Sequence, residues 1–328
     1  MRIIRPATLD DLDAMEKFAL TMTYGVTSLP KSRQKLEQKL KESQEAFSAE
    51  KNFPHSLSYF FLLEDLKTGK KLGTCQLLPA VGNSIPLWVY KVEPGEHPLL
   101  RPHQICDGPT ELRGLFLLPE ARRGHLGKML SWSRFLFLAS FPGRFQPKVM
   151  AQMRGIIDST GQSPFWNAVG KKLTGMPLTE GLKIYSIEGT PPKELLTEYP
   201  LYIQLLPKKG QECIGRTHKN TAPALKMLLA NGFKKIPYID PVDGGPTLEA
   251  KASEIRSITQ TVYAKLARIA EPKSGSLQLI ANGRLSWRCT AAAVDLEEKG
   301  ACLSQETADA LQLAIGDPIV LTALELYS

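Results

Sequence analysis

The sequence predicts an α+β fold, in which strands and helices alternate through most of the chain and strands dominate near its end. Apolar, β-prone runs such as SYFFLL and GLFLL recur, and helical stretches separate them. Near the end, the strand-like runs SLQLIANGRLSWRCTAAAV and DPIVLTALELY flank one short helix. We therefore predict a core region over residues 1–190, a second strand–helix–strand region of related pattern over 191–271, and a small β-rich C-terminal subdomain over 272–328.

Length and composition place the chain among globular proteins. With 328 residues it can bury a sizeable core. A typical domain has about 150 residues, so this length favours two domains or one elaborated domain. The net charge of +8 suits a polyanionic partner, such as nucleic acid or an anionic nucleotide thioester, although a solvated basic surface gives the same value. The chain has no dense basic run, RNP-like motif or zinc-finger spacing, so nucleic-acid binding is the less favoured alternative.

Cysteine spacing and the N-terminus bear on cofactors and location. The five cysteines lie far apart and show no metal-ligand spacing, so we expect reduced, structural thiols and no bound metal. The segment MRIIRPATLDDLDAM has no secretory h-region, and no apolar run approaches the roughly 18 residues of a membrane span. We therefore expect a cytoplasmic protein without a membrane partner.

The first 90 residues predict a strand, helices and a hairpin. Residues 2–5 can form a short strand, and Thr8 and Asp11 are placed as a capping box at the start of a helix. The pattern KSRQKLEQKLKESQEAF is typical of an amphipathic surface helix. Thr68 and Gly69 lie in a polar turn between two apolar, β-prone runs, which predicts a hairpin.

The segment ELRGLFLLPEARRGHLGKMLSWSRFLFLAS predicts a strand, a turn and a buried helix. The strand covers residues 111–118 and ends before Pro119, and the helix begins at Leu126. Between them, residues 122–127 form a basic turn that contains glycine. Free backbone N–H groups and the positive end of the helix dipole would meet there, which suits a pyrophosphate. A Gly-x-x-Gly turn can equally be a tight connection.

Further strands and helices are expected in the second half. PKVMAQMRGII predicts a buried strand and PLYIQLL another strand, while SPFWNAVGKKL predicts a short helix that begins at Ser163 and Pro164 and stops near Gly170. FKKIPYIDPVDGGPTLEA predicts a strand that runs into an acidic, Gly-rich loop. Near the C-terminus, SQETADALQLA predicts a helix capped by Ser304.

The stretch RTHKNTAPALKMLLANGF places a histidine in a loop before a short helix. Asn220 or Thr221 can serve as the N-cap, Pro223 fits the first turn, and Asn-Gly supplies the stop. A lone histidine in such a place is more often a solvated or hydrogen-bonded loop residue than a catalyst. These residues alone leave both roles open for His218.

The segments IRPATLDDLDAM and LFLLPEARRGHLGKML resemble GNAT-type acyltransferases, in which an R/Q-x-x-G-x-G/A turn holds the pyrophosphate of acyl-CoA. Residues 122–127 match this turn at its first and last positions, whereas a histidine stands where the family usually has glycine. Histidine is among the residues found more often at positive φ, so the turn can still donate its N–H groups. The resemblance implies a GNAT-like mixed-sheet core with acyl-CoA contacts at Leu115, Leu117, Arg122, Arg123, Gly124, His125 and Gly127.

Four longer stretches resemble the arginine N-succinyltransferase family. In order, they are GVTSLP, MRGIIDSTGQSPFWNAVGKK, IGRTHKNTAPALKMLLANGF and YIDPVDGGPTLE. The resemblance covers most of residues 1–250, while residues 88–108 depart from the family pattern. It implies transfer of a succinyl group from succinyl-CoA, as co-substrate, to the α-amino group of L-arginine. It also implies no permanently bound cofactor and a homo-oligomer.

The same resemblance implies that His218 is the proton donor and that Leu115 contacts succinyl-CoA. A nearby positive helix end favours neutral imidazole, so a role as base, or as base and then acid, also stays open. Glu111 is the competing candidate base, unless it is an edge carboxylate in a salt bridge. Asp158 and Asp243 could bind a guanidinium or ammonium group, although each could equally be a turn-forming residue. Ornithine, another amine or a protein amine would be an alternative acceptor for the same chemistry.

Overall fold

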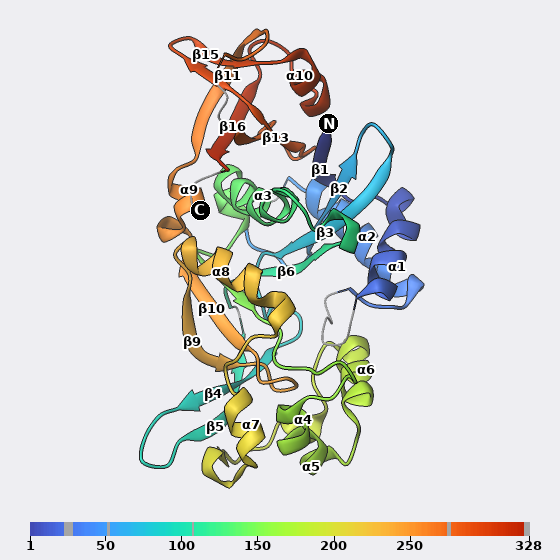
Figure 1. Ribbon diagram of the computed structural model, residues 1–328, viewed down its shortest axis with the longest axis vertical. Helices are drawn as coiled ribbons and strands as arrows, with labels where there is room; N and C mark the ends of the chain where they lie inside the picture. The colour runs from blue at the N-terminus through green and yellow to red at the C-terminus, as the bar shows by residue number, and fades with distance from the viewer. Residues whose placement is uncertain (23–28, 51–52, 107, 274–276, 325–328) are drawn as a thin grey trace.

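The structure is a computed structural model that describes residues 1–22, 29–50, 53–106, 108–273 and 277–324 (Figure 1). Part of the GVTSLP stretch lies outside these ranges. Within them, strands join edge to edge into one mixed sheet that runs the length of the molecule. Along the long axis in Figure 1, the strands and their helices form an upper, a middle and a lower level. The predicted α+β class is confirmed.

The middle level begins with an antiparallel run of strands. In the order in which they pair, these are β1 (Arg2–Pro6), β2 (Tyr59–Asp65), β3 (Lys70–Leu78) and β6 (Thr110–Leu117). Helices α1 (Leu12–Thr21) and α2 (Arg33–Ser48) cover these strands. The Thr8 N–H donates to the Asp11 carboxylate at 2.9 Å, and Gly69 has a φ of +67° in the β2–β3 turn. The predicted helix start and hairpin are therefore confirmed.

Two parallel strands diverge in the middle of the sheet. Strand β7 (Lys148–Gln152) pairs with β6 at Thr110 and Glu111, the first two residues of β6. Beyond Glu111, β6 keeps its pairing with β3, whereas β7 pairs with β10 (Pro246–Lys251) on its other side. The ladder recorded between β6 and β7 ends there in the ranges described, so the β7-facing edge of β6 is open from Leu112 onward.

A β-bulge in β6 lies at this opening. Between Thr74 and Gln76 the register against β6 shifts, so that one residue of β3 stands opposite both Gly114 and Leu115. Gly114 adopts a φ of +55°, and a Cβ at this position would lie 2.6 Å from the Gln76 side-chain nitrogen. Glycine therefore allows the bulge, which leaves one residue out of the β3 ladder.

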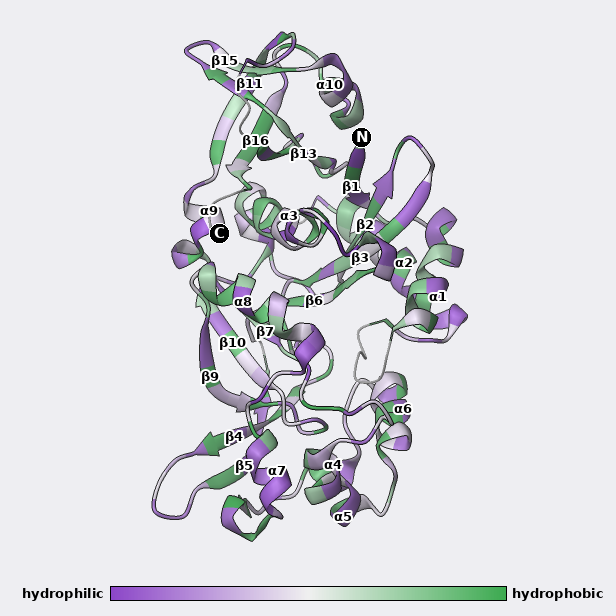
Figure 2. Cartoon of the chain, viewed as in Figure 1, coloured by the Kyte–Doolittle hydropathy of each residue, from purple (hydrophilic) through white to green (hydrophobic). Residues whose placement is uncertain are grey.

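Helix α3 (Leu126–Ser140) follows β6 and is covered on two sides (Figure 1). One side packs on β3 and β6, and the other faces strands of the C-terminal sheet, where the Phe137 ring meets Trp287 edge-on at 5.1 Å. Residues 129–139 are buried, and α3 is largely green in Figure 2. The buried apolar helix predicted to begin at Leu126 is confirmed.

The upper level is the C-terminal sheet. Its strands are β11 (Val262–Ile269), β12 (Leu277–Ala281), β13 (Cys289–Ala293), β14 (Asp295–Glu297), β15 (Gly300–Leu303) and β16 (Pro318–Ala323). Ser304 accepts a hydrogen bond from the Thr307 N–H and caps α10 (Gln305–Leu311), as predicted. Strand β11 pairs with β15 and β16, so the sheet includes a strand that precedes residue 272. Pairing of Ile4 with Cys289 joins this sheet to β1.

The lower level combines parts of the regions 1–190 and 191–271. Its strands are β4 (Leu87–Glu93), β5 (Leu99–Ile105), β8 (Leu201–Tyr202) and β9 (Lys234–Ile239). Its helices are α4 (Pro164–Ala168), α5 (Gly170–Thr174), α6 (Leu178–Glu188) and α7 (Lys208–Cys213). Helix α8 (Ala222–Ala230) lies above this level in Figure 1, whereas α9 (Arg256–Thr259) packs against α3 and β16. Short 3₁₀ turns complete the chain: η1 (Leu9–Asp11), η2 (Pro119–Ala121), η3 (Pro142–Arg144), η4 (Lys193–Leu195), η5 (Ile203–Leu205), η6 (Lys219–Thr221) and η7 (Ala252–Glu254).

Of two local expectations for the lower level, one is wrong in detail and the other is confirmed. PLYIQLL forms the two-residue strand β8 and then the turn η5. Strand β8 lies at the edge of the sheet and pairs with only the first two residues of β5. The helix predicted to begin at Ser163 and Pro164 and to stop near Gly170 is confirmed as α4, which ends at Ala168. A second short helix, α5, begins at Gly170 itself. A Cβ at Gly170 would lie 2.3 Å from the Trp166 ring, so this glycine serves close packing rather than termination.

Candidate functional site

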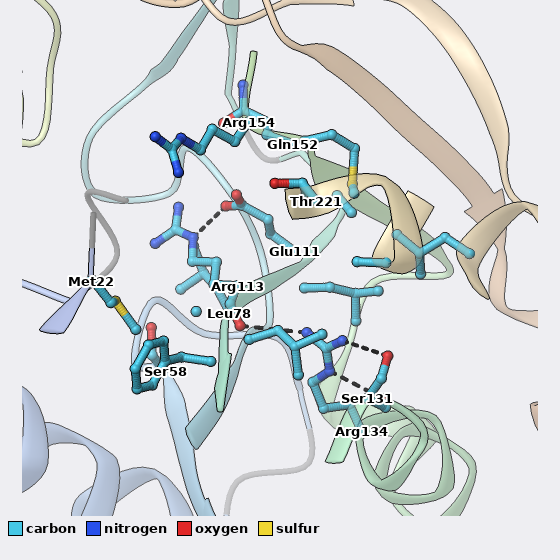
Figure 3. A pocket seen from close by; sticks show the side chains of 18 of the residues that line it. Met22, Ser58, Leu78, Glu111, Arg113, Ser131, Arg134, Gln152, Arg154 and Thr221 are labelled. Carbon is cyan, nitrogen blue, oxygen red and sulfur yellow. Dashed lines mark hydrogen bonds and ion pairs between the residues drawn. The ribbon is translucent and has the colours of Figure 1, made fainter. Parts of the chain in front are cut away.

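A cavity of about 910 Å³ opens where β6 and β7 diverge. Strands β6 and β7, the turn before α3, and helices α2, α3, α6 and α8 contribute to its wall (Figure 3). The predicted site residues that line it are Glu111, Leu115, Leu117, Arg122, Arg123, Gly124, Gly127 and Asp243. The cavity thus brings together the basic turn, the bulge and two of the predicted carboxylates.

The basic turn forms one end of the cavity. Arg122 donates from Nε to the Leu117 carbonyl at 3.0 Å, which holds its side chain against the end of β6. Arg123 is exposed at the rim. The first N–H groups of α3, from Leu126 onward, have no partner inside the helix and carry the positive end of its dipole. This end of the cavity can therefore bind a phosphate group.

The backbone of the basic turn does not require glycine at the position of His125. The residue with positive φ in the turn is Gly124, at +62°, whereas His125 has a φ of −92° and a ψ of 4°. His125 therefore needs no left-handed backbone and its side chain is exposed. Gly127 lies in the first turn of α3, where a Cβ would meet only the Leu117 side chain at 3.6 Å. A histidine in place of the usual glycine leaves the turn unstrained.

Charged side chains gather beyond the bulge. Glu111 is 5% exposed and forms an ion pair with Arg113, which is the salt bridge considered as one of its two roles. Figure 3 shows this pair facing Arg154, with Gln152 and Thr221 nearby. The second end of the cavity is therefore polar and carries charges of both signs.

Asp243 is a buried carboxylate that supports the loop structure. Its Oδ2 accepts from the Gly155 N–H and its Oδ1 from the Gly245 N–H, each at 2.8 Å. Burial, followed by the nearby Asp240 carboxylate, raises the pKa of Asp243 to about 8. Burial also raises the pKa of Asp240. Asp243 thus combines the turn-forming role with a place in the cavity wall.

Asp158 does not line this cavity. It is exposed, and its Oδ1 accepts hydrogen bonds from the N–H groups of Thr160 and Gln162 and from the Thr160 hydroxyl. These bonds, the Thr160 hydroxyl first, lower the pKa of Asp158. This geometry matches the turn-forming alternative for Asp158.

His218 lies behind the cavity wall. It is 8% exposed and does not line the cavity, although Asn220 and Thr221 do. The backbone N–H of His218 donates to the Arg154 carbonyl at 2.9 Å. Its ring Nδ1 accepts from the Asn220 N–H at 3.1 Å, so His218 caps the turn η6. An accepting Nδ1 carries no proton, which leaves the proton of a neutral ring on Nε2.

The surroundings of His218 favour neutral imidazole. Burial lowers its pKa first, the charges of Arg154 and Lys219 lower it further, and a hydrogen bond with the Ile157 backbone acts in the opposite direction. Thr221 precedes α8 without a capping bond from its side chain, and Pro223 lies in the first turn as predicted. The capping residue at this place is therefore the histidine itself.

Several residues of the cavity wall were missed in the sequence. They are Gly114, Arg134, Gln152, Arg154, Tyr185 and Asp240. The available signal was a charge inside a helix that is otherwise apolar, which is unusual for a buried helix and marks Arg134. The other residues have no local signal, because their meeting depends on the divergence of β6 and β7.

The side chains described by the structure include no group of three or more His, Cys, Asp or Glu residues arranged to hold a metal ion. Among the helices within the same ranges, none has the length and apolar character that crossing a membrane requires.

Comparisons with known proteins agree with this geometry. The family model described as arginine N-succinyltransferase beta subunit matches residues 2–257, and the model of its C-terminal domain matches residues 262–323. Arginine N-succinyltransferase subunit alpha of Pseudomonas aeruginosa is 33% identical over 99% of this chain and 100% of its own. Arginine N-succinyltransferase of Escherichia coli is 34% identical over 99% and 98%.

A solved structure has the same fold. Arginine/ornithine succinyltransferase subunit AI from Pseudomonas aeruginosa superposes with a TM-score of 0.89 at 31% identity, covering 99% of each chain. The match confirms the mixed-sheet acyltransferase fold expected from the sequence, including the C-terminal sheet. With family models that match both parts and full-length relatives above 30% identity, the chain belongs to the arginine N-succinyltransferase family.

Proposed function

We propose that the protein transfers the succinyl group of succinyl-CoA to the α-amino group of L-arginine. The observation that carries this proposal is the cavity between the diverging strands β6 and β7, which has the basic glycine turn at one end and buried charges at the other. The relatives named for this activity match the whole chain. Such a cavity suits a long anionic thioester whose reactive end must meet a charged acceptor.

The donor is expected to follow the open edge of β6. Its pyrophosphate would bind at residues 122–127 and at the N-terminus of α3. From there the pantetheine arm can use the β6 backbone groups that have no partner on β7, as an added strand would. This route leads to the bulge and places the thioester carbonyl near Leu115. A backbone N–H at the bulge can then stabilise the oxyanion of the tetrahedral intermediate.

The reaction needs a free amine, an oxyanion donor and a proton for the leaving thiolate. The α-amino nitrogen attacks the thioester carbon, the carbon–sulfur bond breaks, and the proton lost by nitrogen balances the proton gained by sulfur. We assign this proton transfer to His218, which does not line the cavity itself but is bonded to Asn220 of the cavity wall. Its lowered pKa suits a base that first accepts the amine proton and then returns it to sulfur. Glu111, which lines the cavity, is the competing base.

The acceptor is expected to bind at the polar end of the cavity. Arginine carries a guanidinium group, and Asp243 is a carboxylate of the wall that could receive it. A cation beside Asp243 would also favour the ionised carboxylate, which burial and Asp240 now disfavour. Ornithine stays an alternative acceptor, since the solved relative is named for both amino acids.

The test is release of free CoA thiol from succinyl-CoA with arginine, ornithine, lysine or agmatine, combined with mass spectrometry of the product. Preferential release with arginine and a product heavier by one succinyl group are expected. Acceptor-independent release, or preference for another amine, would contradict the proposal. For the proton transfer, His218→Ala is compared with Glu111→Gln and with His97→Ala, because His97 is exposed and bonds to Gln204 outside the cavity.

A homo-oligomer and a cytoplasmic location stay predictions of the sequence, and light scattering after size-exclusion chromatography tests the first of them. Nucleic-acid binding is the rival reading of the net charge. Submicromolar binding of RNA or DNA that weakens steeply with salt would favour that rival, because counterion release has this signature.

A further inference from the structure

Arg134 is a buried arginine in the wall of the cavity. It lies in α3 on the side that faces β6, and it is 3% exposed. Figure 3 shows its guanidinium group beside Ser131, with a hydrogen bond toward the Arg113 backbone. A fully charged side chain thus borders the cavity from within an apolar helix.

The charge of Arg134 has only neutral partners. Its Nε donates to the Ser131 carbonyl at 3.2 Å, its NH2 group to the Ser131 hydroxyl at 3.0 Å, and its NH1 group to the Arg113 carbonyl at 3.4 Å. These bonds use three of the five N–H donors of a guanidinium group. Within the described ranges, no carboxylate lies at ion-pair distance from it. Burial lowers the pKa of Arg134.

A buried charge without a counter-charge is costly, and proteins usually compensate it with a partner ion. Arg144 offers a comparison inside the same chain, because it is also buried, at 4% exposed. Its guanidinium group donates to the carbonyls of Ala46 and Ala49 and to the Tyr59 hydroxyl, and it does not line the cavity. Arg144 therefore ties segments together, whereas Arg134 lines the cavity where a ligand would lie.

The position of Arg134 separates it from the phosphate end of the cavity. It lies about two helical turns, roughly 10 Å, beyond Gly127 along α3. The Arg113 carbonyl that it contacts immediately precedes the Gly114 bulge. Arg113 itself is paired with Glu111. An anion at Arg134 would thus belong to the acyl end of the donor and not to the CoA phosphates.

We propose that Arg134 binds the free carboxylate of the succinyl group and thereby selects acyl-CoA donors with an anionic end. The inference rests on the proposed function, since it takes the thioester to lie at the bulge. The carboxylate is three carbon–carbon bonds from the thioester carbonyl, so a cation next to the bulge is in the right region. A guanidinium group with two free donors is suited to a carboxylate.

The test compares succinyl-CoA with butyryl-CoA, which has a methyl group where succinyl has its carboxylate. Binding is measured by isothermal titration calorimetry without any acceptor, on the wild type, Arg134→Met, Arg134→Lys and Arg144→Met. We expect the wild type to prefer succinyl-CoA and Arg134→Met to reduce that preference by on the order of 100-fold. Arg134→Lys should reduce the preference for succinyl-CoA less than Arg134→Met does. Arg144→Met should keep the wild-type ratio of the two affinities.

Two results overturn the inference: equal affinity of the wild type for both thioesters, or an unchanged ratio in a folded Arg134→Met variant. If Arg134→Met does not fold, Arg134→Lys and the wild-type ratio decide the question. The outcome is separate from that of the proposed function. A donor preference that depends on Arg134 can exist without arginine acylation, and arginine acylation can exist with no such preference.

Discussion

The bulge at Gly114 allows a prediction that links backbone strain to catalysis. In Gly114→Ala, a φ of +55° costs an L-residue about 1–2 kcal/mol. The new Cβ would lie 2.6 Å from the side-chain nitrogen of Gln76, which is buried, so that amide must move, at a cost of about 1 kcal/mol. We expect the free energy of unfolding to fall by about 2–3 kcal/mol.

Gly69→Ala is the matched control. Gly69 has a similar φ of +67°, but nothing lies within 4 Å of its Cβ position, and it belongs to the β2–β3 turn outside the cavity. Its cost should therefore be the backbone contribution alone, about 1–2 kcal/mol. Urea denaturation measures both variants, and thiol release from succinyl-CoA measures kcat at a temperature where both remain folded.

The two variants should differ most in catalysis. Gly69→Ala should keep the wild-type kcat, whereas Gly114→Ala should lower kcat by roughly 10- to 100-fold, because the oxyanion donor near Leu115 moves with the bulge. If Gly114→Ala is no less stable than Gly69→Ala and keeps the wild-type kcat, the bulge neither depends on glycine nor positions the thioester.

Three further predictions concern the site. His218→Ala should lower kcat by roughly 10²–10⁴-fold and remove an acidic limb of the pH profile that lies below pH 6.5, since the pKa of His218 is lowered; unchanged turnover and pH dependence would exclude it as the proton carrier. Arg123→Ala should raise the KM for succinyl-CoA several-fold, more at low salt than at high salt, and leave the KM for arginine unchanged; an equal rise in both would contradict a phosphate contact. Asp243 has its folded pKa raised from 3.8 to about 8, so its contribution to stability is complete below pH 4 and is lost as the pH rises through 8. Urea denaturation at pH 6.5 and 9 should show a loss of stability in the wild type that is smaller in Asp243→Asn, and equal losses would show that Asp243 does not titrate in this range.

Local patterns made much of the core predictable. The segment from Glu111 to Ser140 combines a β-prone run, a proline, a basic glycine turn and an apolar helix, and each signal acts over a few residues. The same holds for the β2–β3 hairpin and for α10 with its cap at Ser304. Strand β11 was missed because VYAKLARI mixes charged residues with exposed apolar ones, and its pairing with β16 comes from residues more than 50 positions away.

The site was less predictable, because its hydrogen bonds and its cavity form between residues from different segments of the chain. The sequence placed His218 at a helix start, but not the hydrogen bond from the Asn220 N–H that fixes its tautomer. It also could not decide between the two roles of Asp243, whose oxygens bind the N–H groups of Gly155 and Gly245 from separate strand ends. Arg134 was missed, because its place in the cavity wall follows from the divergence of β6 and β7.

The double cover of α3 has a consequence for how the chain folds during synthesis. The helix that follows the basic turn packs its second face on strands from residues 277–323, and Tyr263 donates to the carbonyl of its residue Ala139. Strand β1 likewise pairs with β13. A nascent chain that ends near residue 257 would therefore expose Phe137 and the open edge of β1. We expect such a ribosome-bound chain to bind chaperones and to gain protease resistance only after β16 has emerged from the exit tunnel.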